Sequence, residues 1–126
     1  MTKTQVLFIC SRNEWRSLTA EKLFAKHPNY AVRSAGTSNN ARIKVTLGMI
    51  GWADIIFCME KKHRDKLTQA FGEALENKRV IVLNIPDDYV FMDEMLIEIL
   101  QQRVAEHIDI WRTAACIFKE KNRQPL

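Results

Sequence analysis

The sequence predicts an α/β protein in which helices flank both faces of a four-stranded parallel sheet, forming a three-layer sandwich. The main observation is an alternation of short apolar runs with longer amphipathic segments, which occurs four times along the chain. No linker, internal repeat or low-complexity segment interrupts this order before the basic C-terminal end. Because parallel strands are joined by right-handed crossovers, strand–helix alternation indicates a parallel sheet covered on both sides.

Four short apolar runs are predicted to be the strands. Residues 4–9 (TQVLFI) are bounded by polar residues, as expected of a strand that is buried on both faces. Residues 79–83 (RVIVL) form the most strand-like run because they are rich in β-branched side chains. The other two predicted strands cover residues 30–33 and 54–59.

Four segments with helical spacing of apolar residues lie after these runs. Residues 17–26 have Ser17 as a possible cap, and residues 42–51 form a modest helix that contains two glycines. Residues 60–71 are charged with an apolar stripe, and residues 92–118 are predicted as one long helix. The apolar face of that last helix is predicted to consist of Met95, Ile99, Val104, Ile108, Trp111 and Ala115.

The size and composition of the chain are typical of one globular domain, residues 1–126. Apolar residues make up 47% of the chain and charged residues 27%, which is enough to build a single core. The net charge of +4 is mild and spread along the chain, so we expect a local anion site rather than a nucleic-acid partner. No stretch approaches the roughly 20 apolar residues that span a bilayer, so we expect a cytoplasmic protein without membrane contact.

The three cysteines have no paired spacing of the kind found in zinc sites or disulfide frameworks, so we expect reduced thiols. Cys58 lies in an apolar run and Cys116 on the apolar stripe of the last predicted helix. Both are therefore predicted to be structural. Cys10 differs, because it ends the first strand and is followed after five residues by Arg16.

The stretch from Cys10 to Ser17 has the features of an anion-binding loop. Ligands of an open parallel sheet bind beyond the carboxyl ends of its strands, and Cys10 lies at such an end. The N-terminus of the following helix favours an anion and stabilises a thiolate, while Arg16 offers a planar pair of donors to phosphoryl oxygens. C-x5-R alone arises by chance in many proteins. Its place between a strand and a helix favours Cys10 as a nucleophile toward phosphorus.

With these motifs the chain resembles the low-molecular-weight protein tyrosine phosphatases. The stretch Val6-Leu-Phe-Ile-Cys-x-x-Asn-x-x-Arg-Ser17, followed by Thr19-Ala-Glu21, is similar to their signature of a strand, C-x5-R-S and a helix. Later stretches that resemble the family in the right order are Ser34-Ala-Gly-Thr37, Ala53-Asp-Ile-Ile-Phe-Cys-Met-Glu-Lys-Lys-His63 and Ile85-Pro-Asp-Asp-Tyr89. The likeness covers most of the chain and is closest to short bacterial members, which lack much of the middle segment of full-size enzymes.

The resemblance implies roles for the matched positions. Cys10 attacks phosphorus, Arg16 clamps the phosphoryl group, and Asp87 matches the general acid. Asn13 and Ser17 brace the loop. The implied phosphate-binding residues are Ser11, Arg12, Asn13, Glu14, Trp15, Arg16 and Ser17. Trp15 and Tyr89 are expected at the rim of the pocket, together with the loop at Asn39 and Asn40. No metal and no organic cofactor is implied, because the thiolate is the nucleophile and the loop supplies the positive potential.

Two adjacent carboxyl groups, Asp87 and Asp88, could supply the proton that a leaving oxygen needs. Both follow Pro86 in the loop after the last predicted strand, at the edge of the sheet where Cys10 also lies. The resemblance favours Asp87. The alternative is that these residues only cap the helix that starts near Met92.

Several positions depart from the family or have an open role. Arg12 stands where full-size relatives usually have glycine, and a positive φ there would be costly for arginine. Trp15 replaces a cysteine found in many relatives, and it either walls the pocket or plugs the loop against the helix. His27 and His63 have charged neighbours and are predicted to be surface histidines. Met92 and Met95 are predicted to be core residues.

The leading functional hypothesis is a cysteine-dependent phosphomonoester hydrolase with a phosphocysteine intermediate. Its substrate would be a phosphotyrosine protein or a small aryl or alkyl phosphate. A catalytically weak phosphate- or phosphopeptide-binding module is an alternative, which Arg12 and the short middle segment leave open. Arsenate reduction is a third possibility, but it needs two further thiols close together beside the nucleophile, whereas Cys58 and Cys116 are predicted in regular, buried elements.

Overall fold

The computed structural model describes residues 3–108, in which four strands alternate with four helices as the sequence predicts. The strands are β1 (Thr4–Cys10), β2 (Tyr30–Gly36), β3 (Ile55–Cys58) and β4 (Arg79–Val82). The helices are α1 (Arg16–Phe24), α2 (Leu47–Trp52), α3 (Lys61–Leu75) and α4 (Glu94–Ala105).

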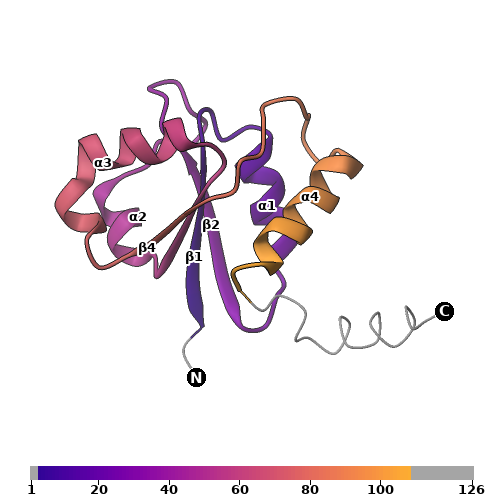
Figure 1. The fold of residues 1–126 in the computed structure, drawn as a ribbon, viewed down its shortest axis with the longest axis horizontal. Coiled ribbons are helices and arrows are strands. Elements are labelled where there is room, and N and C mark those ends of the chain that lie inside the picture. Colours follow the sequence, from indigo (N-terminus) through magenta and orange to yellow (C-terminus); the bar gives the residue numbers. More distant parts are fainter. Residues whose placement is uncertain (1–2, 109–126) are drawn as a thin grey trace.

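The strands form one parallel sheet in the order β2-β1-β3-β4, so β1 lies between two neighbours (Figure 1). Its pairing with β2 runs as far as Cys10 and Gly36, and its pairing with β3 runs as far as Ile9 and Cys58. The chain leaves β1 toward one edge of the sheet and later crosses back to build the other. This reversal of strand order beside β1 is where an open α/β sheet offers a crevice for ligands.

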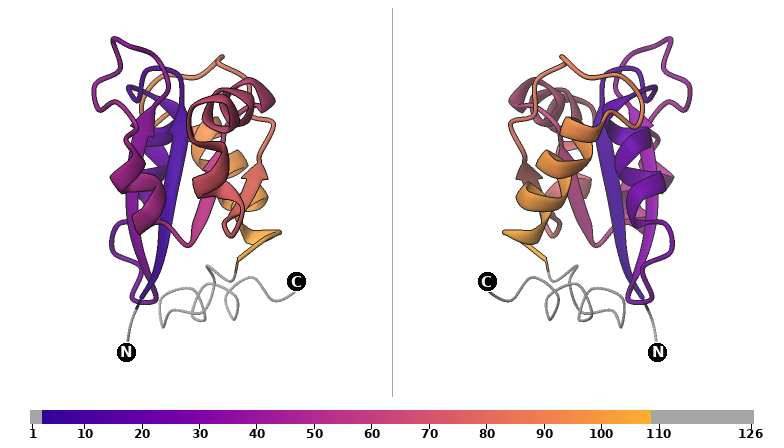
Figure 2. Two further views of the ribbon diagram at one scale, coloured as in Figure 1. Left: turned by 90° about the vertical axis from the view of Figure 1, so that its left-hand side faces the viewer. Right: turned by 90° about the vertical axis from the view of Figure 1, so that its right-hand side faces the viewer.

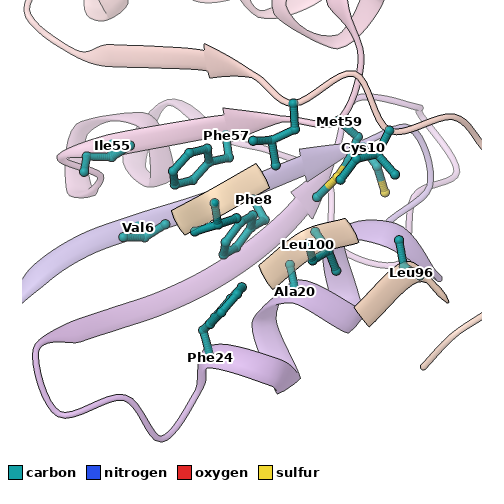
Figure 3. Packing of buried hydrophobic residues seen from close by; sticks show 13 residues of the cluster. Val6, Phe8, Cys10, Ala20, Phe24, Ile55, Phe57, Met59, Leu96 and Leu100 are labelled. Atoms are coloured by element: carbon teal, nitrogen blue, oxygen red, sulfur yellow. The ribbon is translucent and has the colours of Figure 1, made fainter. Parts of the chain in front are cut away.

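Two layers of helices cover the sheet, with α1 and α4 on one face and α2 and α3 on the other (Figure 1, Figure 2). The residues of β1 alternate between two apolar clusters, since successive side chains of a strand point to opposite faces. On the α1 and α4 side, the Phe8 ring stacks on Phe24 and Phe57 at centroid distances of 5.8 and 5.3 Å (Figure 3). Cys10 belongs to this cluster, so the nucleophile candidate is anchored in the core.

The prediction of one continuous helix over residues 92–118 is wrong within the described residues. Helix α4 begins at Glu94, after Asp93 accepts a hydrogen bond from the N–H of Met95, and it ends at Ala105 in a turn. The helical cap near Met92 is therefore Asp93. Trp111, Ala115 and Cys116, which the prediction also included, lie outside the described residues.

Other boundaries and buried faces also differ from the predictions. Helix α2 starts at Leu47 rather than at residue 42, because Thr46 caps it by accepting the N–H of Met49. The buried residues of α4 are Leu96, Leu100 and Val104. Met92 and Met95 are exposed, which corrects their prediction as core residues. No helix in residues 3–108 is both long enough and apolar enough to cross a membrane.

Candidate active site

The loop between β1 and α1 wraps around the sulfur of Cys10. The backbone N–H of Asn13 donates to Cys10 Sγ at 3.2 Å, and Ser17 Oγ lies 2.9 Å from the same sulfur. The tight turn is made at Asn13, which has a positive φ of 57°. Asparagine tolerates this conformation better than most residues, and Arg12 does not adopt it. The backbone strain expected at Arg12 is therefore absent.

A chain of buried polar side chains holds the loop in this shape. The Asn13 side-chain amide donates to Ser17 Oγ and to Ser34 Oγ, both at 2.8 Å. Ser34 in turn donates to Glu21 Oε1 at 2.6 Å. Ser17 lies inside α1 and is buried, so its predicted role as a helix cap is wrong. Ser17 Oγ accepts from Asn13, and two acceptors lie within reach of its own proton, the sulfur of Cys10 at 2.9 Å and the carbonyl of Ala35 at 3.5 Å. The sulfur is the nearer of the two.

The end of β2 lies directly against the start of the loop. A Cβ atom added at Gly36 would lie 2.4 Å from the carbonyl oxygen of Ser11 and 2.7 Å from Ala41 Cβ. Only glycine leaves room for this approach. Just beyond it, the N–H of Ser38 donates to the Ser11 carbonyl at 2.9 Å, and the N–H of Arg42 donates to the Arg12 carbonyl at the same distance. The backbone after β2 therefore fixes the outer side of the loop.

The guanidinium of Arg16 is almost fully buried, with 2% of the residue exposed. Its Nη1 donates to Glu60 Oε1 at 2.5 Å and to the carbonyl of Ile85 at 2.8 Å, while Nε lies 3.7 Å from Asp87 Oδ1. Burial alone would raise the pKa of Glu60, but the hydrogen bond and charge of Arg16 lower it. Glu60 is therefore a fixed carboxylate that orients Arg16, and it was missed as a site residue by sequence reasoning.

His63 is fully buried, which corrects its prediction as a surface histidine. Its Nδ1 accepts the N–H of Glu60 at 3.0 Å, and its Nε2 lies 2.9 Å from Ser11 Oγ. Burial, followed by the charge of Arg16, lowers the pKa of His63 to about 4. The ring of His63 is therefore neutral, and it touches the loop directly.

His27 is also buried, which corrects its prediction as a surface histidine. Its Nδ1 accepts the N–H of Asn29 at 3.1 Å.

A small pocket of about 100 Å³ opens above Cys10. Its lining residues are Cys10, Ser11, Arg12, Glu14, Trp15, Arg16 and Asp87. Trp15 is 43% exposed, so it stands at the wall of this pocket rather than in the core. At the rim, Arg12 Nη2 lies 3.5 Å from Glu14 Oε1.

Several residues that the sequence suggested do not line this pocket. Asp87 and Asp88 are both exposed, but only Asp87 contributes to the lining. Tyr89 packs against the core cluster on the α1 and α4 side and is not among the residues that line this pocket. Asn39 lines a separate, open hollow together with Ser38 and Lys66.

The other thiol that the structure describes is unsuited to chemistry. Cys58 is buried in β3, and this burial raises its pKa to about 12. A thiol with so high a pKa is not ionised at neutral pH, which agrees with the predicted structural role. In residues 3–108, no group of three or more His, Cys, Asp and Glu residues could hold a metal ion.

No protein-family model and no curated protein sequence matches the chain. Solved structures do resemble it. The YwlE arginine phosphatase from Geobacillus stearothermophilus is 20% identical with a TM-score of 0.64, and the match covers 98% of each chain. The tyrosine phosphatase Wzb from Escherichia coli K30, in complex with phosphate, is 21% identical with a TM-score of 0.68 over 83% of this chain and 96% of that one.

A third similar structure is SP-PTP, a low molecular weight protein tyrosine phosphatase from Streptococcus pyogenes. It is 14% identical with a TM-score of 0.66, and the match covers 84% of this chain and 94% of that one. These three proteins share the parallel sheet and its helical layers with this chain. The protein therefore has the fold of the bacterial low-molecular-weight protein tyrosine phosphatases, as the resemblance of its motifs predicted.

Proposed function

We propose that the protein is a cysteine-dependent phosphomonoester hydrolase. The observation that carries this proposal is the surroundings of the Cys10 sulfur, which meets the N–H of Asn13 and the hydroxyl of Ser17 at the base of a pocket lined by Arg16. Hydrogen-bond donors aimed at a sulfur stabilise its anionic form, and a thiolate is the nucleophilic form of cysteine. The pocket of about 100 Å³ is of a size for a phosphoryl group rather than for a whole metabolite.

In the first step, the Cys10 thiolate attacks phosphorus, the S–P bond forms and the bond from phosphorus to the leaving oxygen breaks. Asp87 is the acid that gives its proton to this oxygen, because its carboxyl group lines the pocket and Asp88 does not. In the second step, the Asp87 carboxylate takes a proton from water, and the water oxygen attacks phosphorus. The S–P bond then breaks, and inorganic phosphate leaves with the thiolate restored.

Arg16 stabilises the charge that grows on the phosphoryl oxygens. Two acceptors, Glu60 and the carbonyl of Ile85, bind Nη1 and hold the planar group at a fixed angle. A donor that is already oriented needs no rearrangement during the reaction, which is the source of its catalytic effect. Glu60 is therefore a positioning residue in this proposal.

The substrate is an aryl phosphate such as the phosphotyrosine side chain. Trp15 supports this choice, because its exposed indole stands at the pocket wall, where an aromatic leaving group can stack. A phosphoarginine side chain is the second candidate, since the carboxylates of Glu14 and Asp87 also line the pocket and would attract a guanidinium group. Structural neighbours include both tyrosine and arginine phosphatases.

The alternatives have less support. The weak-binding hypothesis rested partly on strain at Arg12, which has no positive φ. Arsenate reduction needs a reactive relay of thiols, and the burial and raised pKa of Cys58 argue against its taking part.

Hydrolysis of p-nitrophenyl phosphate by the wild type and by Cys10→Ser tests the proposed function. We expect turnover by the wild type, none by Cys10→Ser, and phosphate binding by both. Phosphate binding without turnover by the wild type would favour the binding module instead. The kcat/KM values for a phosphotyrosine peptide and a phosphoarginine peptide, measured with the wild type and Glu14→Gln, decide between the two substrates.

A further inference from the structure

His63 is a fully buried histidine that takes no part in the proposed chemistry, yet it contacts the loop that carries it. The hydrogen bonds fix the state of its ring. Nδ1 accepts the backbone N–H of Glu60 at 3.0 Å, so Nδ1 carries no proton. A neutral imidazole has one N–H, which must then lie on Nε2. Nε2 is therefore the donor in its 2.9 Å contact with Ser11 Oγ.

Ser11 is the first residue after the nucleophile and lines the pocket above it. Its hydroxyl is held by His63, and its carbonyl accepts the N–H of Ser38 on the opposite side of the loop. The backbone of Gly36 lies so close to this carbonyl that a Cβ atom there would be 2.4 Å from the oxygen. The start of the loop is thus fixed by one side-chain bond and one backbone bond.

The same imidazole is connected to the end of the loop. Its Nδ1 binds the backbone of Glu60, and the carboxylate of Glu60 binds the guanidinium of Arg16. One ring at the start of α3 therefore links Ser11, which follows the nucleophile, with Arg16, which closes the C-x5-R motif. Neither link is visible in the sequence, because 52 positions separate Ser11 from His63 and 44 separate Arg16 from Glu60.

We propose that His63 is a positioning residue that holds the phosphate-binding loop in its oxyanion-binding shape by donating from Nε2 to the hydroxyl of Ser11. The contribution of His63 to catalysis rests on the proposed function. Its contribution to oxyanion binding can be measured separately. With the hydroxyl anchored, the backbone N–H groups of the loop are held in place before phosphate arrives. A ligand then does not have to order the loop, and preorganisation of this kind increases affinity.

The charged groups around His63 keep the donor in place at physiological pH. Arg16 faces the ring from α1, and Lys62 and Lys66 face it from its own helix, and all three oppose a further proton. Glu60 is the group that favours protonation, but burial and the three cations outweigh it. The pKa of about 4 therefore leaves the ring neutral from pH 5 to 8, and the hydrogen bond to Ser11 does not change over that range.

A double-mutant cycle between His63 and Ser11 tests the proposal, with the affinity for inorganic phosphate as the readout. His63→Asn keeps an acceptor at the position of Nδ1 and removes the donor at Nε2. Ser11→Ala removes the acceptor of the same bond. We expect each variant to bind phosphate about tenfold more weakly, and the double variant to bind no more weakly than either single one. His63→Gln brings an amide donor back toward Ser11 and is expected to recover part of the affinity.

Two controls separate positioning from general stability. His27→Asn makes the same substitution at another buried histidine, which hydrogen-bonds to Asn29, and is expected to leave phosphate affinity unchanged. Thermal unfolding of every variant is measured beside the affinities. If His63→Asn fails to fold, Ser11→Ala still decides, because it removes the same bond without altering a buried ring. Unchanged phosphate affinity in folded Ser11→Ala overturns the proposal.

The outcomes also separate this proposal from the proposed function. Additive losses in the cycle mean that His63 acts through something other than Ser11 and overturn the inference, whatever the turnover. If the wild type binds phosphate and the losses of affinity in the cycle are not additive, but no turnover is seen, the inference is supported. The proposal that the protein is a hydrolase is then overturned. If the wild type binds no phosphate, both proposals fail.

Discussion

The hydroxyl of Ser17 lies 2.9 Å from the sulfur of Cys10 and accepts the side-chain amide of Asn13 at 2.8 Å. The Ser17 proton lies within reach of the sulfur and of the Ala35 carbonyl at 3.5 Å, and the sulfur is nearer. In the proposed mechanism Ser17→Ala therefore removes a donor from the thiolate. A hydrogen bond to a charged group contributes about 1.5–3 kcal/mol, and we expect alkylation of Cys10 by iodoacetamide at pH 7 to slow by about tenfold or more. Ser38→Ala, in an exposed loop, is the control. An unchanged rate in Ser17→Ala would mean that the thiolate is stabilised by the backbone alone.

Arg16→Lys should retain the fold and lose most of the activity. A lysine provides one point charge in place of a planar group that binds Glu60 and the Ile85 carbonyl and, in the proposed function, the phosphoryl oxygens as well. The loss of one preorganised donor costs about 2–4 kcal/mol of transition-state stabilisation. Arg12→Lys makes the same change at an exposed position of the same loop, and kcat/KM should change little. A larger loss in Arg12→Lys would assign the clamp to Arg12.

Asp87→Asn should slow the hydrolysis of a substrate with a poor leaving group far more than that of one with a good leaving group. A phenolate of high pKa needs a proton to depart, whereas p-nitrophenolate departs more easily without one. The measurement compares phenyl phosphate with p-nitrophenyl phosphate. Asp88→Asn is the matched control, since this adjacent carboxyl is exposed like Asp87 but does not line the pocket. The roles of the two residues are exchanged if Asp88→Asn alone gives the leaving-group effect.

Gly36→Ala should damage the site and the fold together. The added methyl group would lie 2.4 Å from the Ser11 carbonyl and 2.7 Å from Ala41 Cβ, so the loop has to move. Overpacking of this kind costs about 1–3 kcal/mol, measured by urea unfolding, and phosphate affinity should fall with it. Gly51→Ala in α2 meets nothing within 4 Å and should instead stabilise the helix by roughly 0.5–1 kcal/mol. Equal effects of the two substitutions would contradict the close approach at Gly36.

The free energy of unfolding should fall as the pH drops from about 6.5 to about 4, in part because of His63. The unfolded chain binds a proton on this histidine near pH 6.5, whereas the folded protein does so only near pH 4. The neutral ring thus contributes stability that is present above pH 6.5 and lost at acidic pH, up to about 3 kcal/mol. Urea unfolding at pH 4.5 and pH 7 measures this. In His63→Asn the difference between the two pH values should shrink by that contribution.

The order of strands and helices could be predicted from the sequence because each apolar run or stripe is a local pattern. The buried face of α4 could not. Met95 and Leu96 both belong to helical repeats, and only packing against the sheet decides that Leu96 is buried while Met95 is exposed. His63 was mistaken for a surface residue because its neighbours Lys62 and Arg64 are charged, although the next turn of the helix presents Leu67 to the core.

Within the candidate site, Cys10 and Arg16 were recognisable because the C-x5-R spacing lies in one short stretch. Glu60 and His63 were not, since their partners are Arg16 and Ser11, which are far away along the chain. The sequence offered one signal that could have found them. Both residues come directly after β3, and the carboxyl end of a strand that pairs with β1 must lie beside the loop after β1.

The position of β1 in the middle of the sheet has a consequence for biosynthesis. The ribosome delivers Cys10 and its loop first, while Ile85 and Asp87 follow β4, the last strand of the sheet. A nascent chain that ends before β4 therefore carries the thiol but lacks the Ile85 carbonyl that orients Arg16 and the carboxyl group that lines the pocket. The proposed catalytic site is complete only when translation has passed these residues and β4 has paired with β3. If the proposed function holds, we expect chains that end before β4 to be inactive.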